Sequence, residues 1–390
     1  MILFINTTAD PRNASAKLVS ALRGQLFSEG TESVLAYGRG YSTLTQDIKI
    51  GSTSDLLSHT AFSRLTGREG EASGIATYNL LRQLDKLDIK LVHIHNLHGH
   101  YLNVRMLTNW VKAKQLPVVL TLHDCWTFSP RCATFIHNNC EPSAAYCRHC
   151  RHKDEYPAAL YFNPERNLAK KRQWFQGIDN ITVAGVSNWI TDLAKQHFPS
   201  YDARFITIGN GVDHTIFNPE DRNINGNSKN KKLIAAAANW EPSKGLEHII
   251  ELSSHLPAEY ELTVIGNLMG KALPDSIKYG GRNLSPEQMA EAYRSADILL
   301  FPAKAETFGM VLAEALACGT PVIANQSPAS REIITPTDGL LADFSSPESV
   351  VSAISSILEY PGKYNPESKD IKKTAEEYAS LYRSILKKEV

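Results

Sequence analysis

Continuous apolar runs alternate with stretches of helical periodicity along most of the chain, and this alternation limits the possible folds more than any other feature. The apolar runs are residues 1–5, 33–37, 91–95, 117–122, 181–187, 203–211, 233–238, 262–266, 297–302 and 320–325. The helical stretches are residues 14–28, 101–114, 163–176, 189–197, 246–256, 286–295, 311–318 and 370–388. Because the apolar runs are unbroken, they predict parallel strands that helices cover on both faces.

The alternation is interrupted once, by the polar segment 218–232, whose lack of periodicity is typical of a linker. The sequence therefore predicts an α/β fold of two doubly wound, Rossmann-like domains, for which 390 residues suffice. We expect an N-terminal domain at 1–217, a C-terminal domain at 218–365, and a last helix in 366–390 that packs back on the N-terminal domain. Ligands of such folds bind at the carboxyl ends of strands, so a cleft between the domains is the expected site.

Charge and apolar content exclude several classes of protein. Lys and Arg total 41 and Asp and Glu total 41, so the net charge is zero and no nucleic-acid partner is expected. No apolar run reaches the roughly 18 residues that span a bilayer, and the N-terminus does not resemble a signal peptide. We expect a cytoplasmic protein, with any membrane contact peripheral and on the inner face of the cell membrane. Residues 167–176 combine bases with aromatic residues, which suits either anionic lipid or a solvated helix face over a core.

Residues 301–325 carry the strongest sign of chemistry. Glu306 and Glu314 stand eight positions apart across a predicted strand, loop and helix. The backbone N–H groups that open this helix, where phosphate or a sugar can bind, belong to Phe308, Gly309, Met310 and Val311. Two surface glutamates beside a helix are the alternative interpretation.

This segment resembles the E-x7-E signature of the retaining family-4 glycosyltransferases, which have the GT-B fold. Residues 210–219, NGVDHTIFNP, are similar to the motif at the family's domain junction, and residues 238–250 are similar to its phosphate-binding segment, with Lys244 and Gly245. Glu332 and residues 338–342 match the loop that follows. The resemblance extends over nearly the whole chain and implies two Rossmann-like domains that face each other across a cleft.

The N-terminal half is similar to a bacterial polysaccharide-biosynthesis subgroup of colanic-acid or capsule type. The matching features are residues 93–107 and 121–132, then Cys140, Cys147, Cys150 and Tyr156-Pro157. The resemblance implies a hexosyltransferase that moves a sugar, with retention, from a nucleotide diphosphate donor to a glycan that is expected to be lipid-linked. The family's favoured mechanism uses no protein nucleophile and no catalytic metal, so no cofactor is expected for catalysis.

The resemblance also implies roles on the donor side, in the C-terminal domain. Glu314 would bind the ribose hydroxyls, Lys244 the diphosphate, and Glu306 with the backbone of residues 308–311 the sugar. A cation suits the diphosphate because its negative charge grows as it leaves, although a lysine at a helix start is commonly only solvated. Many family members have bases where this chain has Asn239 and Ser243, so Arg282 is expected to assist. Gly245 and Asn239 complete the expected donor contacts.

On the N-terminal, acceptor-binding side, His123 follows an apolar run and by resemblance contacts the donor sugar near the reacting carbon. A loop histidine satisfied by Asp124 is the alternative. The residues expected to line the acceptor pocket, some of them only fixing the loop, are His95, Asn96, His98, Tyr101 and Asp124. Residues 13–17 and 327–330 lack glycines that are usual in the family, which could tune the substrate or weaken activity.

Five of the six cysteines lie in the loop 123–157. Four of them could bind zinc, because four thiolates can form a tetrahedral site. The last two of these four form a C-x2-C pair, which is half of a usual zinc site. These four are Cys132, Cys140, Cys147 and Cys150. Structural zinc, free thiols and a disulfide all stay open.

Two other functions are compatible with a GT-B fold. A sugar-nucleotide epimerase lacks support, because the E-x7-E and NGVD matches belong to transferases. A non-catalytic sugar-binding relative is supported only by the missing glycines and bases. Turnover of any sugar nucleotide would separate an enzyme from a binding protein.

Overall fold

The computed structural model describes residues 1–134, 140, 143–150, 156–200, 202–220, 222, 230–360 and 366–387. The chain forms two compact units. Unit 1 comprises Met1–Gly209 and Thr374–Val390, and unit 2 comprises Asn210–Lys373. Unit 1 is therefore made of two separate pieces of the chain.

These boundaries differ from the predicted ones at 217 and 365. The segment after Gly209 belongs to unit 2 because Val212 and Phe217 are buried in the core of that unit. Val212 also accepts a backbone hydrogen bond from Ile371 and donates one to Lys369. Of the predicted linker 218–232, residues 221 and 223–229 lie outside the described residues.

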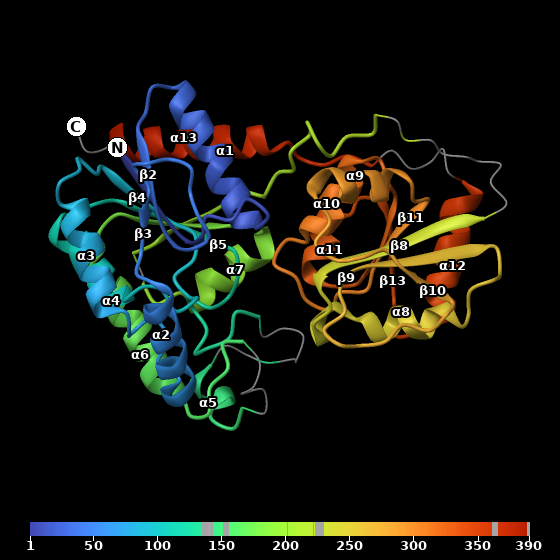
Figure 1. Ribbon diagram of the computed structural model, residues 1–390, viewed down its shortest axis with the longest axis horizontal. Coiled ribbons are helices and arrows are strands. Elements are labelled where there is room, and N and C mark those ends of the chain that lie inside the picture. The colour runs from blue at the N-terminus through green and yellow to red at the C-terminus, as the bar shows by residue number, and fades with distance from the viewer. Residues whose placement is uncertain are drawn as a thin grey trace. The chain divides into compact units, whose positions relative to one another are not determined.

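Unit 1 is built on a seven-stranded parallel sheet (Figure 1). Its strands are β1 (Ile2–Thr8), β2 (Ser33–Arg39), β3 (Ile48–Lys49), β4 (Leu91–Ile94), β5 (Val118–Leu122), β6 (Ile181–Gly185) and β7 (Arg204–Thr207). They lie in the order β3-β2-β1-β4-β5-β6-β7, so the first strand is in the interior and the order reverses beside it.

Helices cover both faces of this sheet. They are α1 (Ala14–Ser28), α2 (Thr53–Thr66), α3 (Gly74–Leu84), α4 (Val104–Ala113), α5 (Ala144–Cys147), α6 (Pro164–Phe175), α7 (Asn188–His197) and α13 (Ile371–Leu386). The Asn13 side chain caps α1, and Leu18, Leu22 and Leu26 point from it into a core that α13 shares. Helices α3, α4 and α6 pack side by side (Figure 1).

Unit 2 repeats the plan with a six-stranded parallel sheet. Its strands are β8 (Lys231–Asn239), β9 (Tyr260–Asn267), β10 (Ile277–Tyr279), β11 (Ile298–Phe301), β12 (Val322–Asn325) and β13 (Gly339–Ala342), in the order β10-β9-β8-β11-β12-β13. Its helices are the short 3-10 helix η2 (Pro242–Lys244), α8 (Leu246–Ser253), α9 (Pro286–Arg294), α10 (Met310–Ala317), α11 (Pro328–Ile333) and α12 (Pro347–Glu359). One apolar core forms under α9 and α10 and another under α8 and α12.

Every strand pair among the described residues is parallel, and both sheets carry helices on two faces. The prediction of two doubly wound, Rossmann-like units is therefore confirmed. The last helix packs in unit 1, where Tyr378 and Tyr382 are buried.

The contact between β6 and α7 gives a first prediction. A Cβ added to Gly185 would lie 2.0 Å from Thr191 Oγ1 and 2.9 Å from its backbone nitrogen. Gly185→Ala should therefore cost about 1–3 kcal/mol of unfolding free energy, as overpacking does. The matched control is Gly24→Ala in α1, where nothing lies within 4 Å, and a gain of up to about 1 kcal/mol is expected. Urea unfolding of both variants measures this, and equal midpoints would contradict it.

Candidate functional site

The donor-side residues gather where the strand order of unit 2 reverses. Strands β8 and β11 are neighbours, and the loops after them carry Lys244 and Glu306. Because parallel strands end at the same edge, these side chains meet there. Lys244 Nζ donates to Glu306 Oε1, and the two side chains are 24% and 21% exposed. The ion pair is thus partly shielded yet reachable from solvent.

Glycine allows the two loops to approach closely. Gly245 has a φ of 75°, and a Cβ there would lie 2.7 Å from the carbonyl oxygen of Pro302. The backbone N–H of Lys304 also donates to Ser243 O at 2.9 Å. The position of Lys244 beside Glu306 therefore depends on backbone contacts as well as on their charges.

Helix α10 begins at this edge from Gly309, which has a φ of 90°. No side chain among the described residues caps its first turn, so its leading N–H groups can bind an external acceptor. The side chains of Phe308, Met310 and Val311 pack against the core below. Glu314 is half-buried in the second turn, and Tyr293 donates to its Oε2 at 3.4 Å.

Two other predicted donor residues are placed differently from Lys244. Asn239 ends β8, is exposed, and accepts a hydrogen bond from Asn267 at 3.1 Å. Arg282 is exposed after β10, and β9 separates that strand from β8. The expected assistance of Arg282 to Lys244 stays a prediction.

In unit 1 the strand order reverses between β1 and β4, and polar residues lie in the last part of β1 and after β4. Thr7 Oγ1 donates to the His98 carbonyl at 2.7 Å, and Asn96 Nδ2 donates to Asn6 Oδ1 at 3.4 Å. Asn6 and Thr7 were missed in the sequence, where they look like the end of the first apolar run. Their only sign was polarity at a strand end.

His98 and Asp124 form the strongest polar contact at this edge. His98 Nε2 lies 2.5 Å from Asp124 Oδ2, and His98 Nδ1 lies 2.9 Å from the Tyr156 hydroxyl. Burial would lower the pKa of His98, but the Asp124 carboxylate outweighs it and the pKa is raised. Burial would raise the pKa of Asp124, but His98 lowers it. The pair is therefore most strongly bound when His98 is protonated and Asp124 ionised.

His95 and Tyr101 are buried, with 2% and 3% of their surface exposed. The Tyr101 hydroxyl donates to Asn96 O at 2.5 Å, and His95 Nδ1 lies 3.0 Å from His123 Nε2. This burial favours the alternative that these two side chains fix the loops, and their contact with an acceptor stays a prediction. Asn96, His98, His123 and Asp124 are half-buried and reach the surface.

Two further charged groups hold these loops from below. Glu69 Oε1 accepts from the Gly99 N–H at 2.8 Å. Lys171 donates to the carbonyls of Trp126 and Ser129, the latter at 2.8 Å, and its Nζ lies 3.8 Å from the Trp126 ring centroid. Burial lowers the pKa of Lys171 to about 7.

Residues 167–176 form a helix face over a core, one of the two interpretations of this stretch, with Trp174 and Phe175 buried, but Lys171 is buried as well and is not solvated. The helical period would have shown it, because Asn167, Lys171 and Trp174 share one buried face of α6.

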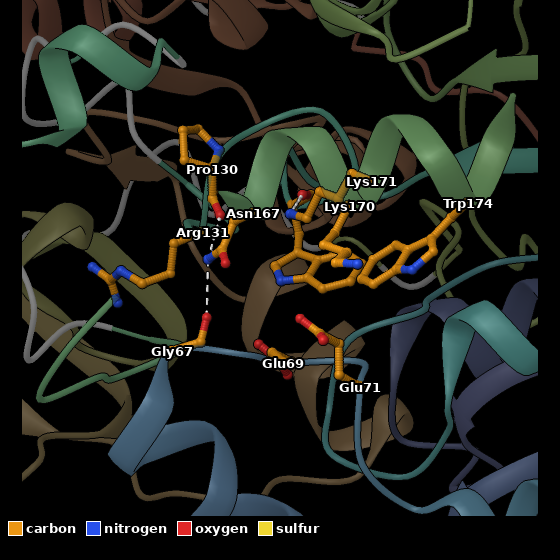
Figure 2. A pocket seen from close by; sticks show the side chains of 10 residues that line it. Gly67, Glu69, Glu71, Pro130, Arg131, Asn167, Lys170, Lys171 and Trp174 are labelled. Carbon is orange, nitrogen blue, oxygen red and sulfur yellow. Dashed lines mark hydrogen bonds between the residues drawn. The ribbon is translucent and has the colours of Figure 1, made fainter. Parts of the chain in front are cut away.

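Between these loops and α6 lies a small cavity (Figure 2). Glu69 and Glu71 line it from the segment after α2, and Lys170, Lys171 and Trp174 line it from α6. Its volume is about 10 Å³, room for about one water molecule. It is therefore too small to bind a sugar.

The four cysteines of the predicted zinc site are neighbours, although residues 135–139, 141–142 and 151–155 around them lie outside the described residues. Burial and the Cys132, Cys150 and Cys140 thiols raise the pKa of Cys147 to about 12. None of the six cysteines, all of which are described, is in a disulfide. No described group of three or more His, Cys, Asp or Glu side chains has metal-binding geometry.

Comparison with known families identifies both units. Residues 217–378 match the family described as glycosyl transferases group 1, and residues 25–216 match glycosyltransferase family 4. The chain is a nucleotide-sugar-dependent glycosyltransferase of the GT-B fold. It belongs to family 4 of these enzymes, as its motifs predicted.

Individual relatives are distant. WcaC of Escherichia coli (strain K12), a glycosyl transferase assigned to colanic acid biosynthesis, is 23% identical over 76% of each chain. The D-inositol 3-phosphate glycosyltransferase of Rhodococcus opacus (strain B4) is 24% identical over 48% of each chain. The chain thus spans about half the length of that second relative.

Solved structures share the fold. Anabaena Alr3699/HepE in complex with UDP and glucose superposes with a TM-score of 0.68 at 14% identity, covering 98% of this chain and 99% of that one. WaaG, a glycosyltransferase involved in lipopolysaccharide biosynthesis, superposes with a TM-score of 0.62 at 15% identity, covering 97% of this chain and 95% of that one. Among the described helices, none has both the length and the apolar character needed to cross a bilayer.

The His98–Asp124 pair predicts a pH-dependent stability. The pKa of Asp124 is lowered, so its ionised form stabilises the fold at pH values above the usual pKa of 3.8. The pKa of His98 is raised, so its protonated form stabilises the fold below pH 6.5, and this stabilisation is lost as the pH rises through the raised pKa. Asp124→Asn should therefore cost about 1.5–3 kcal/mol near pH 5.5, as a charge-assisted bond does, and less near pH 9. Urea unfolding at both pH values measures this.

The control for that experiment is Asp192→Asn, which removes an exposed pair with Lys195. Its cost should be small at both pH values. A cost of Asp124→Asn that does not change with pH would contradict the assigned charge states.

Proposed function

We propose that this glycosyltransferase moves a sugar from a nucleotide diphosphate to a lipid-linked glycan, with retention, during assembly of a bacterial surface polysaccharide. The observation that carries the proposal is the Lys244–Glu306 ion pair at the strand reversal of unit 2, beside the uncapped start of α10. A cation next to free N–H groups suits a diphosphate. The similarity to WcaC supports the polysaccharide, because that relative is assigned to colanic acid biosynthesis.

The donor would bind unit 2. Lys244 would hold the diphosphate, Glu306 the sugar hydroxyls and Glu314 the ribose hydroxyls. In the free protein Lys244 and Glu306 neutralise each other, so an arriving diphosphate competes with Glu306 for the ammonium group. That exchange would turn the carboxylate toward the sugar at the moment the donor binds.

Retention follows from a reaction on one face of the sugar. The bond between the anomeric carbon and the diphosphate oxygen breaks while the acceptor oxygen bonds to the same face. The acceptor proton passes to the leaving phosphate oxygen, so no protein nucleophile is needed. Lys244 stabilises the charge that grows on the leaving group.

The acceptor would bind unit 1 at the loops after β4 and β5. Asn96, His98 and Asp124 offer donors and acceptors for sugar hydroxyls, and His123 lies beside them. Peripheral membrane contact would bring a lipid-linked acceptor to these loops. Leu57 and Leu65 of α2 are 64% and 61% exposed, and their spacing of eight residues puts them about 80° apart around the helix. Leu160, 73% exposed, is held next to Arg64 by a backbone hydrogen bond of 2.7 Å.

The test is a thermal-shift screen with UDP-, GDP-, ADP- and dTDP-sugars. It is followed by an assay for release of nucleoside diphosphate from the sugar nucleotide that stabilises the fold.

Lys244→Ala should lower kcat strongly while ground-state binding changes less, because the charge of Lys244 acts mainly in the transition state. The matched control is Lys232→Ala, an exposed lysine at the opposite end of β8. If Lys244→Ala keeps kcat within about threefold, less than about 1 kcal/mol, the assignment is wrong. Binding without any turnover would favour a non-catalytic relative.

A metal test separates catalysis from structure. We propose that the Cys132, Cys140, Cys147 and Cys150 thiolates hold one zinc per chain, which would order the long loop beside His123. Elemental analysis of protein purified without chelator should find about one equivalent, and brief EDTA treatment that leaves this zinc bound should not abolish turnover. Zinc-free protein whose thiols all titrate in the native state would reject the site. Strict dependence on added Mg²⁺ would reject metal-free catalysis.

A further inference from the structure

The histidine that follows β5 is held by a second, buried histidine. His95 is 2% exposed, its Nδ1 lies 3.0 Å from His123 Nε2, and the two rings stack with centroids 5.3 Å apart at 20°. The remaining nitrogen of His95, Nε2, is buried and has no hydrogen-bond partner among the described residues. His95 therefore makes one ring hydrogen bond, and it makes it to His123.

Both rings are neutral at ordinary pH. Burial, then His93 and His123, lower the pKa of His95 well below its usual value. Burial also lowers the pKa of His123 to about 4, although Asp124 opposes the shift. Each neutral imidazole carries one N–H, so a single proton lies between His95 Nδ1 and His123 Nε2.

Two tautomers can make this bond, and they leave different groups buried. If His123 donates from Nε2, then His95 must carry its proton on Nε2, where no described acceptor lies. If His95 donates from Nδ1, its Nε2 is only an unpaired acceptor. Buried N–H groups without an acceptor are the rarer defect in proteins, which favours donation by His95.

The ring of His95 is also fixed from its other side. The His93 ring packs against it at an angle of 35°, with centroids 4.1 Å apart. His93 Nδ1 is bound to the Tyr382 hydroxyl at 2.5 Å, and its Nε2 to Thr121 Oγ1 at 2.7 Å. Both nitrogens of His93 are bound, and Tyr382 comes from the buried face of α13. His93 is therefore held in place, and it restricts the position of the His95 ring.

We infer that His95 is a positioning residue that fixes the tautomer of His123, donating to its Nε2 so that His123 carries its proton on Nδ1. His123 then acts on substrate as a hydrogen-bond donor from Nδ1, and its basic nitrogen is occupied. It is not a general base that removes the acceptor proton. The effect of the tautomer on turnover rests on the proposed function.

The first experiment reads the tautomer without any substrate. Long-range proton–nitrogen correlation NMR of protein labelled with ¹⁵N-histidine shows which ring nitrogen bears the proton. The chain has 13 histidines, so the His123 signals are assigned by their loss in His123→Gln. We expect the proton on Nδ1 of His123 and on Nδ1 of His95. A wild-type spectrum with His123 protonated on Nε2 would overturn the inference.

The second experiment uses a graded pair of variants. His95→Phe keeps the stacked ring but removes the donor, and should change the His123 tautomer and lower kcat about tenfold with little change in donor KM. The asparagine of His95→Asn can donate from its amide, so this variant should restore most of the His123 tautomer and most of kcat. The control is His255→Gln, an exposed histidine of unit 2. An unchanged tautomer and kcat in His95→Phe would reject the role. The expected spectra without turnover of any sugar nucleotide would reject the proposed function alone.

Discussion

The reversal of strand order beside β1 and beside β8 is the constraint on which both halves of the site depend. In each parallel sheet the chain first adds strands on one side of its first strand and then adds the remaining strands on the other side. Loops after the two adjoining strands run to opposite faces, which leaves their strand ends uncovered. Lys244 and Glu306 meet at one such edge, and the loops of His98 and Asp124 lie at the edge of the other sheet.

The acceptor-side loops are held by buried charge rather than by regular structure. Glu69 fixes the loop after β4 through the Gly99 N–H, and Lys171 fixes the loop after β5 through two carbonyls. Burying such groups is costly unless they are bonded. Here both charges bind backbone groups that no strand or helix satisfies. These hydrogen bonds offset the free-energy cost of burial, and they order the irregular backbone that carries the polar side chains at this edge.

The sequence predicted the strands and helices whose patterns are strongest. Helix α1 begins and ends where its helical periodicity predicted, at residues 14 and 28, and β4 and β5 fall within their apolar runs. Helices α2 and α3 were not predicted. In α2 the apolar and polar residues are weakly separated, whereas α3 was missed although Ala76, Leu80 and Leu84 share one buried face. What the sequence could not give was the order of strands in the sheet. That order puts β9 between the strand before Arg282 and the strand before Lys244.

Helix α13 makes unit 1 discontinuous. Its buried face carries Tyr378 and Tyr382 into the same core as β1, β4 and α1. A ribosome therefore releases all of unit 2 before it supplies the last layer of unit 1. Domains usually fold in order from the N-terminus, but here one face of the first sheet, with only α1 packed on this core, stays incompletely covered until the second domain has been made. A fragment that ends at Gly209 would leave the apolar surface under α13 exposed, so the order of synthesis couples the folding of two domains that have separate cores.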